Sequence, residues 1–592
     1  MGEVDIRRHS PAADLIFSGG PVYTAGAARR SMAAAARDTP GDGPPADAVA
    51  VRGGRIVAVG GAREIQDLAG PRTEMVDLRG RALLPGFQDA HVHPAFAGVT
   101  MLRCDLTDAA SLDDALALIA GYARAHPDRE WISGSGWRME WFAGGTPPYD
   151  LLDTAAGGRA VYLTNRDGHG AWVSSRALVL AGLDAASPDP ADGRIERTPD
   201  GRPQGTLHEG AATLVGRLVP APTLDERLAG LLLAQRHLHS LGITAWQDAI
   251  IGDYLGHADP LPVYLAAAAA GQLTARVEGA LWWDRGRGGD QLADLLGRRE
   301  RVRRELDGPG QAGRFRANTV KIMQDGVAEN FTAGMIDDYL DGCGGQTGNR
   351  GLSYVDPREL REHVSRLDAA GFGVHFHAIG DRAVREALDA VAAARAANGP
   401  TAGRHHIAHL QVVHGADIPR FRELGVTANI QALWAAHEPQ MDELTIPFLG
   451  PQRAQRQYPF GDLLRSGARL AAGSDWAVTS ANPLWGIHTA VTRTLPPAAA
   501  GPGTEPPGDG EPGAEPLLPG QALSLGAALA AYTAGSAYVN NLDQAGAVEP
   551  GRLADLVVLD RDPFAGPAKE IGFTAVLLSY VEGERVYAAP TT

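Results

Sequence analysis

The stretch Leu83-Leu-Pro-Gly-Phe-Gln-Asp-Ala-His91-Val-His93 is an apolar run followed by two histidines that are one residue apart. In an extended chain, residues i and i+2 point to the same side, so His91 and His93 can present two imidazoles to one metal ion. A single pair of this kind is weak evidence. Another pair, His237 and His239, falls within a predicted helix, where the same spacing turns the two rings about 200° apart, and we predict a structural role for it.

The middle of the chain alternates between amphipathic stretches and short apolar runs. We predict helices at Leu224–Leu241 and Leu261–Ala270, and strands at Ile243–Gln247 and Ala275–Leu281. Together with a first strand at Ala82–Phe87, further strands are expected at Thr319–Met323, Gly373–His377, His405–His409, Val426–Ile430 and Arg469–Gly473. Alternation of strands and helices predicts a parallel sheet, and eight such units predict an α/β fold of the (β/α)8, or TIM, barrel type.

Polar side chains end or follow several of these predicted strands. His375 and His377 form a further His-x-His pair at the end of one strand. His409 ends the next strand, and Asp475 follows the last one. Each residue alone is explained by a hydrogen-bonded core side chain. Because the C-terminal ends of barrel strands converge on one face, their joint placement favours a shared metal site.

Lys321 lies inside the apolar run Thr319–Met323. An uncompensated ammonium group in such a place is costly. Two remedies are consistent with the sequence: a buried ion pair, or a lowered pKa that allows the amine to react with CO2. The resulting carbamate supplies two oxygens that can bridge two metals. A lysine that extends from the strand end to solvent is the structural alternative.

The two ends of the chain are rich in short β-runs and glycine turns. We predict that residues 1–84 and 546–592 form one composite β-sandwich, because β-rich ends that flank a long middle segment suggest that the termini meet. The barrel is then expected to occupy residues 85–545. Residues from about 104 to 220 lie between the first and second barrel strands. This segment is too long for one crossover and is predicted to form an insertion subdomain.

The composition is that of an ordinary globular protein, with 44% hydrophobic and 21% charged residues among 592. A formal net charge of −16 argues against nucleic acid or an anionic membrane as a partner. The N-terminal residues lack the apolar core of a signal peptide, and no uninterrupted apolar stretch is long enough to span a membrane. We therefore expect a cytoplasmic protein with a small-molecule substrate and with a homodimer as the candidate oligomer. With only Cys104 and Cys343, a disulfide framework is excluded. Ala25–Ala46 and Leu495–Gly520 are predicted to be loops from their Pro, Gly and Ala content.

Several motifs together resemble the amidohydrolase superfamily. They are Pro85-Gly-Phe-Gln-Asp-Ala-His91-Val-His93, the lysine within a strand, two later strand-end histidines and Gly473-Ser-Asp475. Four longer stretches are similar to the branch that contains N-substituted formamide deformylases and YtcJ-like proteins. These are Asp167-Gly-His-Gly-Ala-Trp-Val-Ser-Ser-Arg-Ala-Leu178, Val320-Lys-Ile-Met-Gln-Asp-Gly326, His377-Ala-Ile-Gly-Asp-Arg-Ala383 and Gly473-Ser-Asp-Trp-Ala-Val478. The resemblance covers nearly the whole chain.

The resemblance implies a binuclear metal centre with ligands from six positions. The first metal would be held by His91, His93 and Asp475. The second would be held by His377 and His409, with a carbamylated Lys321 as the bridge. Some members of the superfamily keep a single metal, so one or two per chain are expected. Zinc fits neutral imidazoles and oxygen donors best, with Mn, Co, Ni or Fe as alternatives.

The implied mechanism is attack of a metal-activated hydroxide on a carbonyl carbon. Asp475 would take the proton of the water and pass it to the leaving nitrogen. His169 would donate to the carbonyl or tetrahedral oxygen, or it would anchor the insertion to the barrel. Glu209 would reach the site from the insertion, or it would cap a surface helix.

The predicted activity is hydrolysis of a C–N bond other than a peptide bond, in an amide such as an N-substituted formamide or an N-acyl compound. Deamination of a heterocycle, or hydrolysis of a lactam, carbamate or ester, is the alternative on the same centre, because substrate choice lies in loops. A non-catalytic regulatory descendant is a third interpretation. Such a descendant is expected to lose ligands, and none of the six positions is lost here.

Overall fold

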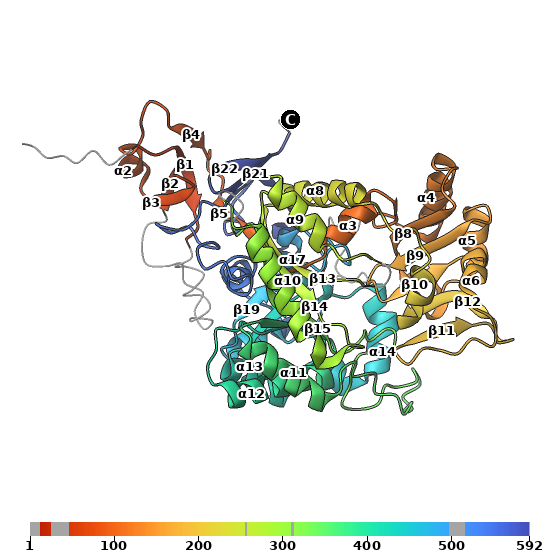
Figure 1. The fold of residues 1–592 in the computed structure, drawn as a ribbon. Coiled ribbons are helices and arrows are strands. Elements are labelled where there is room, and N and C mark those ends of the chain that lie inside the picture. Colours follow the sequence, from red (N-terminus) through yellow and green to blue (C-terminus); the bar gives the residue numbers. More distant parts are fainter. Residues whose placement is uncertain (1–11, 25–45, 255–256, 309–312, 497–514, 591–592) are drawn as a thin grey trace, which may run out of the picture.

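The computed structural model describes residues 12–24, 46–254, 257–308, 313–496 and 515–590 (Figure 1). The two predicted loops at Ala25–Ala46 and Leu495–Gly520 fall largely outside these ranges. The described residues form three sheets: one at the chain ends, one in the insertion and one in the barrel.

The barrel sheet has eight parallel strands that neighbour one another in chain order. They are β6 (Phe87–Val92), β13 (Ile243–Ile251), β14 (Arg276–Trp282), β15 (Phe315–Met323), β16 (Gly373–Ala378), β17 (His406–His409), β18 (Thr427–Ile430) and β19 (Leu470–Ala472). The segment after β19 returns to β6, where the backbone N–H of Asp475 donates to the carbonyl of His91 over 2.7 Å. One step along, the N–H of His93 donates to the carbonyl of Trp476 over 2.9 Å. The predicted (β/α)8 barrel is confirmed.

Helices cover the outside of this barrel (Figure 1). They include α8 (Leu224–Ser240), α9 (Leu261–Ala269), α10 (Leu292–Glu305), α11 (Pro357–Ala369), α12 (Asp381–Asn398), α13 (Ile418–Leu424) and α17 (Pro483–Thr492). The start of α8 is fixed by a capping box, in which Thr223 and Glu226 each accept a hydrogen bond from the other's backbone N–H. All nine residues of β13 are buried, as expected for a parallel strand covered on both faces. Within the described ranges, no helix combines the length and the hydrophobicity needed to cross a bilayer.

The first barrel strand differs from its prediction. The sequence predicts a strand at Ala82–Phe87, but β5 (Leu83–Pro85) pairs with β1 and β20 in the chain-end sheet, and the barrel strand β6 begins at Phe87. The chain passes from one sheet to the other at Gly86, where a Cβ would lie 2.5 Å from the side chain of Thr244. An uninterrupted apolar run therefore serves two sheets. As a consequence, His91 lies inside a strand and not after one.

Both chain ends contribute strands to one sheet. Its strands are β1 (Leu15–Val22), β2 (Ala46–Arg52), β3 (Arg55–Gly60), β4 (Glu74–Asp77), β5, β20 (Leu556–Leu559), β21 (Val576–Val581) and β22 (Glu584–Ala588). The ends meet where β20 runs antiparallel to β5. Buried Arg276 of β14 ties this sheet to the barrel through ion pairs with Asp555 at 2.6 Å and Glu582 at 2.5 Å.

The insertion lies between β6 and β13 and has a sheet of its own (Figure 1). Its strands are β7 (Cys104–Asp105), β8 (Trp131–Trp137), β9 (Ala160–Asn165), β10 (Gly170–Val173), β11 (Gly193–Arg197) and β12 (Pro203–Glu209). Helices α4 (Leu112–Ala125), α5 (Tyr149–Ala155) and α6 (Ser175–Ala181) accompany this sheet. Trp137 and Trp172 are fully buried within it, with ring centroids 6.2 Å apart. The insertion thus has a hydrophobic core independent of the barrel.

Candidate metal centre

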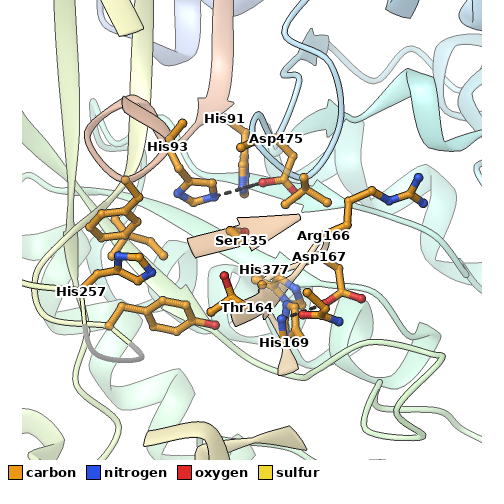
Figure 2. Close-up of a pocket in the computed structure, with 18 of the residues that line it drawn as sticks. His91, His93, Ser135, Thr164, Arg166, Asp167, His169, His257, His377 and Asp475 are labelled. Atoms are coloured by element: carbon orange, nitrogen blue, oxygen red, sulfur yellow. Dashed lines mark hydrogen bonds and ion pairs between the residues drawn. The ribbon is translucent and has the colours of Figure 1, made fainter. Parts of the chain in front are cut away.

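A cleft of about 870 Å³ is formed by the barrel strands and the insertion (Figure 2). One wall carries all six predicted metal ligands, which come from β6, β15, β16, β17 and the segment after β19. The other wall includes residues 164–169, where the chain turns from β9 to β10. His169 lies on this second wall. The cleft therefore joins strand ends of the barrel to a loop of the insertion.

His91, His93 and Asp475 form the tightest group of potential ligands in the described part of the chain (Figure 2). One nitrogen from each ring and one carboxylate oxygen all lie within 4.8 Å of one another. The Oδ1 atom of Asp475 is 3.2 Å from Nε2 of His91 and 3.0 Å from Nε2 of His93. Asp89 holds the two barrel strands in this register, because its carboxylate accepts hydrogen bonds from the backbone N–H groups of His91 and Ser474.

The other three predicted ligands line the same cleft beside this group. The rings of His377 and His409 have centroids 4.4 Å apart, and Nδ1 of His409 is 3.8 Å from Oδ2 of Asp475. Lys321 is 3% exposed and makes no ion pair within the described residues. Burial lowers the pKa of its amine to about 7. A large fraction of this amine is therefore uncharged near neutral pH.

Three residues in or beside the cleft have backbone angles in the left-handed region. The φ values are 74° at His409, 58° at Asp475 and 51° at Glu209. Such conformations cost of order 1–3 kcal/mol each for residues other than glycine and are concentrated at functional sites. Here they turn two potential ligands out of the strand direction and towards the centre of the barrel mouth.

Three buried histidines of the barrel wall, His91, His377 and His409, are uncharged. Burial lowers the pKa of His91, His377 and His409 well below the ordinary value, and the nearby Lys321 acts in the same direction. A neutral imidazole has one N–H and one lone pair, and the lone pair is what binds a metal. The hydrogen-bond partners of each ring therefore decide which nitrogen faces the cleft as a ligand.

Gln247 of β13 and His375 lie beneath the cleft. Gln247 determines which ring nitrogen of His375 carries the proton. The Nε2 amide of Gln247 donates to the carbonyl of Val539 at 3.3 Å, so its Oε1 atom faces the histidines. A flipped amide would set two oxygens against each other. Oε1 lies 2.7 Å from Nδ1 of His375 and 3.0 Å from Nε2 of His406. An amide oxygen only accepts, so His375 carries its proton on Nδ1.

This arrangement also fixes His91. Nε2 of His375 must accept, and it lies 2.8 Å from Nδ1 of His91, which therefore carries the proton. The remaining nitrogen of His91, Nε2, is a lone pair that points at the Asp475 carboxylate from 3.2 Å. Two acceptors in this position repel each other unless a cation lies between them. His409 adds two buried ring nitrogens that have no hydrogen-bond partner among the described residues. The donor set thus fits a divalent metal.

His377 is oriented by Asp325, which follows β15. The Oδ1 atom of Asp325 accepts from Nδ1 of His377 at 3.1 Å and from the backbone N–H of Ile379 at 3.0 Å. Since Nδ1 carries the proton and donates it in a hydrogen bond to the carboxylate, Nε2 of His377 carries the lone pair. Partners of this kind fix the orientation and basicity of metal-binding histidines.

The sequence analysis does not identify Gln247, His375 or Asp325 as residues that orient the metal ligands. Each nevertheless occupies a position in the sequence that could have pointed to it. Gln247 ends the predicted strand Ile243–Gln247, and His375 belongs to a His-x-His pair. Asp325 stands two residues beyond a buried strand, the same kind of position as Asp475. By contrast, the pair His237 and His239 does not line the cleft, and His239 bonds to the carbonyl of Ile243 and to Thr274.

His169 and Glu209 form a buried ion pair on the insertion wall. Nδ1 of His169 donates to Oε2 of Glu209 over 2.9 Å. Burial alone would lower the pKa of His169, but the Glu209 carboxylate outweighs burial and raises that pKa to about 9. Thr332 donates to the other oxygen of Glu209 over 2.8 Å. Glu209 itself does not line the cleft, so it acts through His169 and is not a surface cap.

Known proteins resemble this chain over most of its length. A family model described as "Amidohydrolase family" matches residues 74–587. Protein LONG AFTER FAR-RED 3 from Arabidopsis thaliana is 30% identical over 97% of this chain and 92% of its own length. N-substituted formamide deformylase from Arthrobacter pascens is 29% identical over 91% of this chain and 94% of its own. YtcJ from Bacillus subtilis (strain 168) is 27% identical over 92% and 97%.

Solved structures agree in fold. A metal-dependent hydrolase from Pyrococcus horikoshii OT3 superposes with a TM-score of 0.68 at 23% identity. The match covers 94% of this chain and 99% of that one, so the barrel, the chain-end sheet and the insertion are all included in the likeness.

Proposed function

The chain belongs to the amidohydrolase family, as the motifs predicted, and from this premise we propose that it hydrolyses the C–N bond of an amide other than a peptide bond. The observation that carries the proposal is the pair of acceptors at the centre of the cleft. The lone pair of His91 faces the carboxylate of Asp475 at 3.2 Å, beside neutral His377 and His409. Such a set of donors supports a metal site, and zinc suits it best.

The proposed ligands are the six residues of the barrel wall. His91, His93 and Asp475 hold one metal. His377 and His409 would hold a second where two are present, and Lys321 would add an oxygen ligand once carbamylated. We propose that Lys321 is carbamylated: its neutral amine adds CO2 and loses one proton. Burial without an ion-pair partner supports this chemistry, because the charged ammonium form is disfavoured there.

A divalent metal in this site would lower the pKa of a water molecule to about 7 and polarise the substrate carbonyl. Asp475 is placed to accept a proton from the attacking water and to return it to the leaving nitrogen. Charged His169 faces the same space from the opposite wall (Figure 2). Its free Nε2–H can donate to the carbonyl oxygen as negative charge develops there.

Part of the cleft lining is apolar. Phe96, Ile250, Trp282, Met323 and Trp434 form this part. Such a wall suits an alkyl or aryl substituent on the amide. An N-substituted formamide or an N-acyl compound fits this description, and the relative from Arthrobacter pascens is named as an N-substituted formamide deformylase.

A substrate panel tests the proposal and its alternatives. Formamides, N-acyl amines, lactams, carbamates, esters and aminoheterocycles are incubated with the protein before and after treatment with a chelator. We expect an amide to be the best substrate, with activity lost on chelation and restored by zinc. Release of ammonia from an aminoheterocycle alone would replace the amide proposal with deamination. No turnover of any member by metal-loaded protein would favour a non-catalytic role.

A further inference from the structure

A side pocket adjoins the cleft at Thr100, Thr164 and His257, which line both cavities. Part of its wall is apolar, formed by Val99, Val219, Pro220 and Pro222. The same pocket also contains a guanidinium group, that of Arg103, and the hydroxyl of Ser133. Its lining thus combines an apolar wall with a cation.

One face of helix α3 (Pro94–Met101) connects the metal centre to this pocket. His93 is the N-cap of the helix, and Arg103 follows its last turn. Between them, Phe96 and Thr100 line the cleft. Steps of three and four residues place side chains on the same face of a helix. At 1.5 Å per residue, the backbone of Arg103 lies about 15 Å from that of His93.

Arg103 is a half-buried cation with little to neutralise it. Its Nη1 donates to the hydroxyl of Ser133 over 2.6 Å, and among the described residues it has no ion pair within 4.0 Å. The acidic group that affects it most is Glu226. That carboxylate already accepts the backbone N–H of Thr223 over 2.8 Å and lies 3.8 Å from Arg129. A guanidinium has five N–H donors, so most of those of Arg103 remain for a ligand.

We propose that the side pocket binds a carboxylate at the far end of the substrate, through Arg103. The substrate class is then an amide whose apolar substituent ends in a carboxylate, roughly 10–15 Å from the scissile carbonyl as judged from the length of α3. An arginine matches a carboxylate with two parallel hydrogen bonds, which gives selectivity as well as affinity. This inference rests on the proposed function only in one respect, namely that the amide of the substrate lies at the metal centre.

A pair of ligands that differ only at this end tests the pocket without turnover. Calorimetry compares ω-aminooctanoate with octylamine, which lacks the carboxylate, on the full-length metal-loaded protein. We expect wild type to bind ω-aminooctanoate about 10–100-fold more tightly, the usual range for a charged hydrogen-bonded contact. Arg103→Gln should bind the two ligands equally, and Arg103→Lys should keep part of the preference. Arg217→Gln removes an exposed positive charge next to Gly216 that lines neither cavity, and should leave the preference intact.

Equal binding of both ligands by wild type would overturn the proposal, and so would a preference that survives Arg103→Gln. Turnover of the matched N-formyl derivatives separates this inference from the proposed function. Selective binding without hydrolysis of either derivative would contradict amide hydrolysis and leave the carboxylate pocket standing. Hydrolysis of both at the same kcat/KM would remove the pocket and leave the proposed activity.

Discussion

The two walls of the cleft are built in different ways. The barrel wall takes its groups from buried strands and strand ends, where backbone hydrogen bonds between neighbouring strands fix each position. The insertion wall takes its groups from the turn between β9 and β10, and His169 is held by the side chain of Glu209 from another strand. The barrel wall is therefore suited to hold a metal rigidly. The insertion wall is suited to meet the substrate.

The largest effect is expected on the barrel wall. Asp475→Asn keeps the size of the side chain but removes both a metal ligand and the proposed proton carrier. We expect turnover to fall at least about 10³-fold, because proton transfer alone contributes 10²–10⁴-fold. The far-ultraviolet circular dichroism spectrum should stay unchanged. A variant that retains a tenth of wild-type kcat would show that Asp475 is not in the reaction path.

On the insertion wall, the variant Glu209→Gln is expected to change the pH dependence of kcat. His169 is protonated below its pKa of about 9 and loses its proton above it. Without the Glu209 carboxylate, burial is no longer outweighed and this pKa falls, so the alkaline limb of the pH profile moves to lower pH. We expect kcat to drop about 10–100-fold at pH 8, and less at pH 6, with unchanged metal content. An alkaline limb that stays in place, or loss of metal, would contradict the division between the walls.

A substitution at Gln247 sharpens the comparison, because this residue does not line the cleft and its loss should still weaken metal binding. Gln247→Met removes the acceptor that fixes the His375 and His91 tautomers. We expect metal affinity, measured by competition with a chromogenic chelator, to fall about 10–100-fold. His406→Asn loses a bond to the same oxygen but has no link to His91, so it should bind metal as wild type does. Equal affinity in Gln247→Met would refute the tautomer argument.

The smallest effect is expected from Thr332→Val. It removes the hydrogen bond to Glu209 and the one that the hydroxyl accepts from the backbone N–H of Val327, and it leaves the contact of Glu209 with His169. We expect kcat to fall about fivefold, the size of a single hydrogen bond, while Thr332→Ser stays near wild type. Kinetics at pH 8 measure both. A loss as large as that in Glu209→Gln would mean that Thr332 supports the loop and not only the carboxylate.

The sequence was sufficient for the barrel and for the residues that end its strands. Apolar runs separated by helices predict the eight strands, and strand-end position points to His377, His409 and Asp475 without any knowledge of neighbours. The strand Ala82–Phe87 was misplaced because Leu83–Phe87 is apolar throughout. Its division at Gly86 depends on close contact with Thr244 and on β20, some 470 residues away along the chain.

The side chains that orient the metal-binding histidines could not be predicted either, because they act on residues that are distant in the sequence. Gln247 acts on His375, which lies 128 residues away in the sequence, and Asp325 acts on His377, which is 52 away. Their roles arise only when β13, β15 and β16 come together around the barrel. His169 was identified by its motif, but its charge depends on Glu209, a contact across two strands of the insertion.

Elemental analysis of the purified protein, never exposed to a chelator, tests the central claim most directly. With Gln247 oriented by the carbonyl of Val539, the lone pair of His91 faces the Asp475 carboxylate, and both ring nitrogens of His409 have no hydrogen-bond partner among the described residues. We therefore predict at least one transition metal per chain, with zinc the most abundant, and its loss in His91→Ala. Folded protein that contains no transition metal would contradict the account.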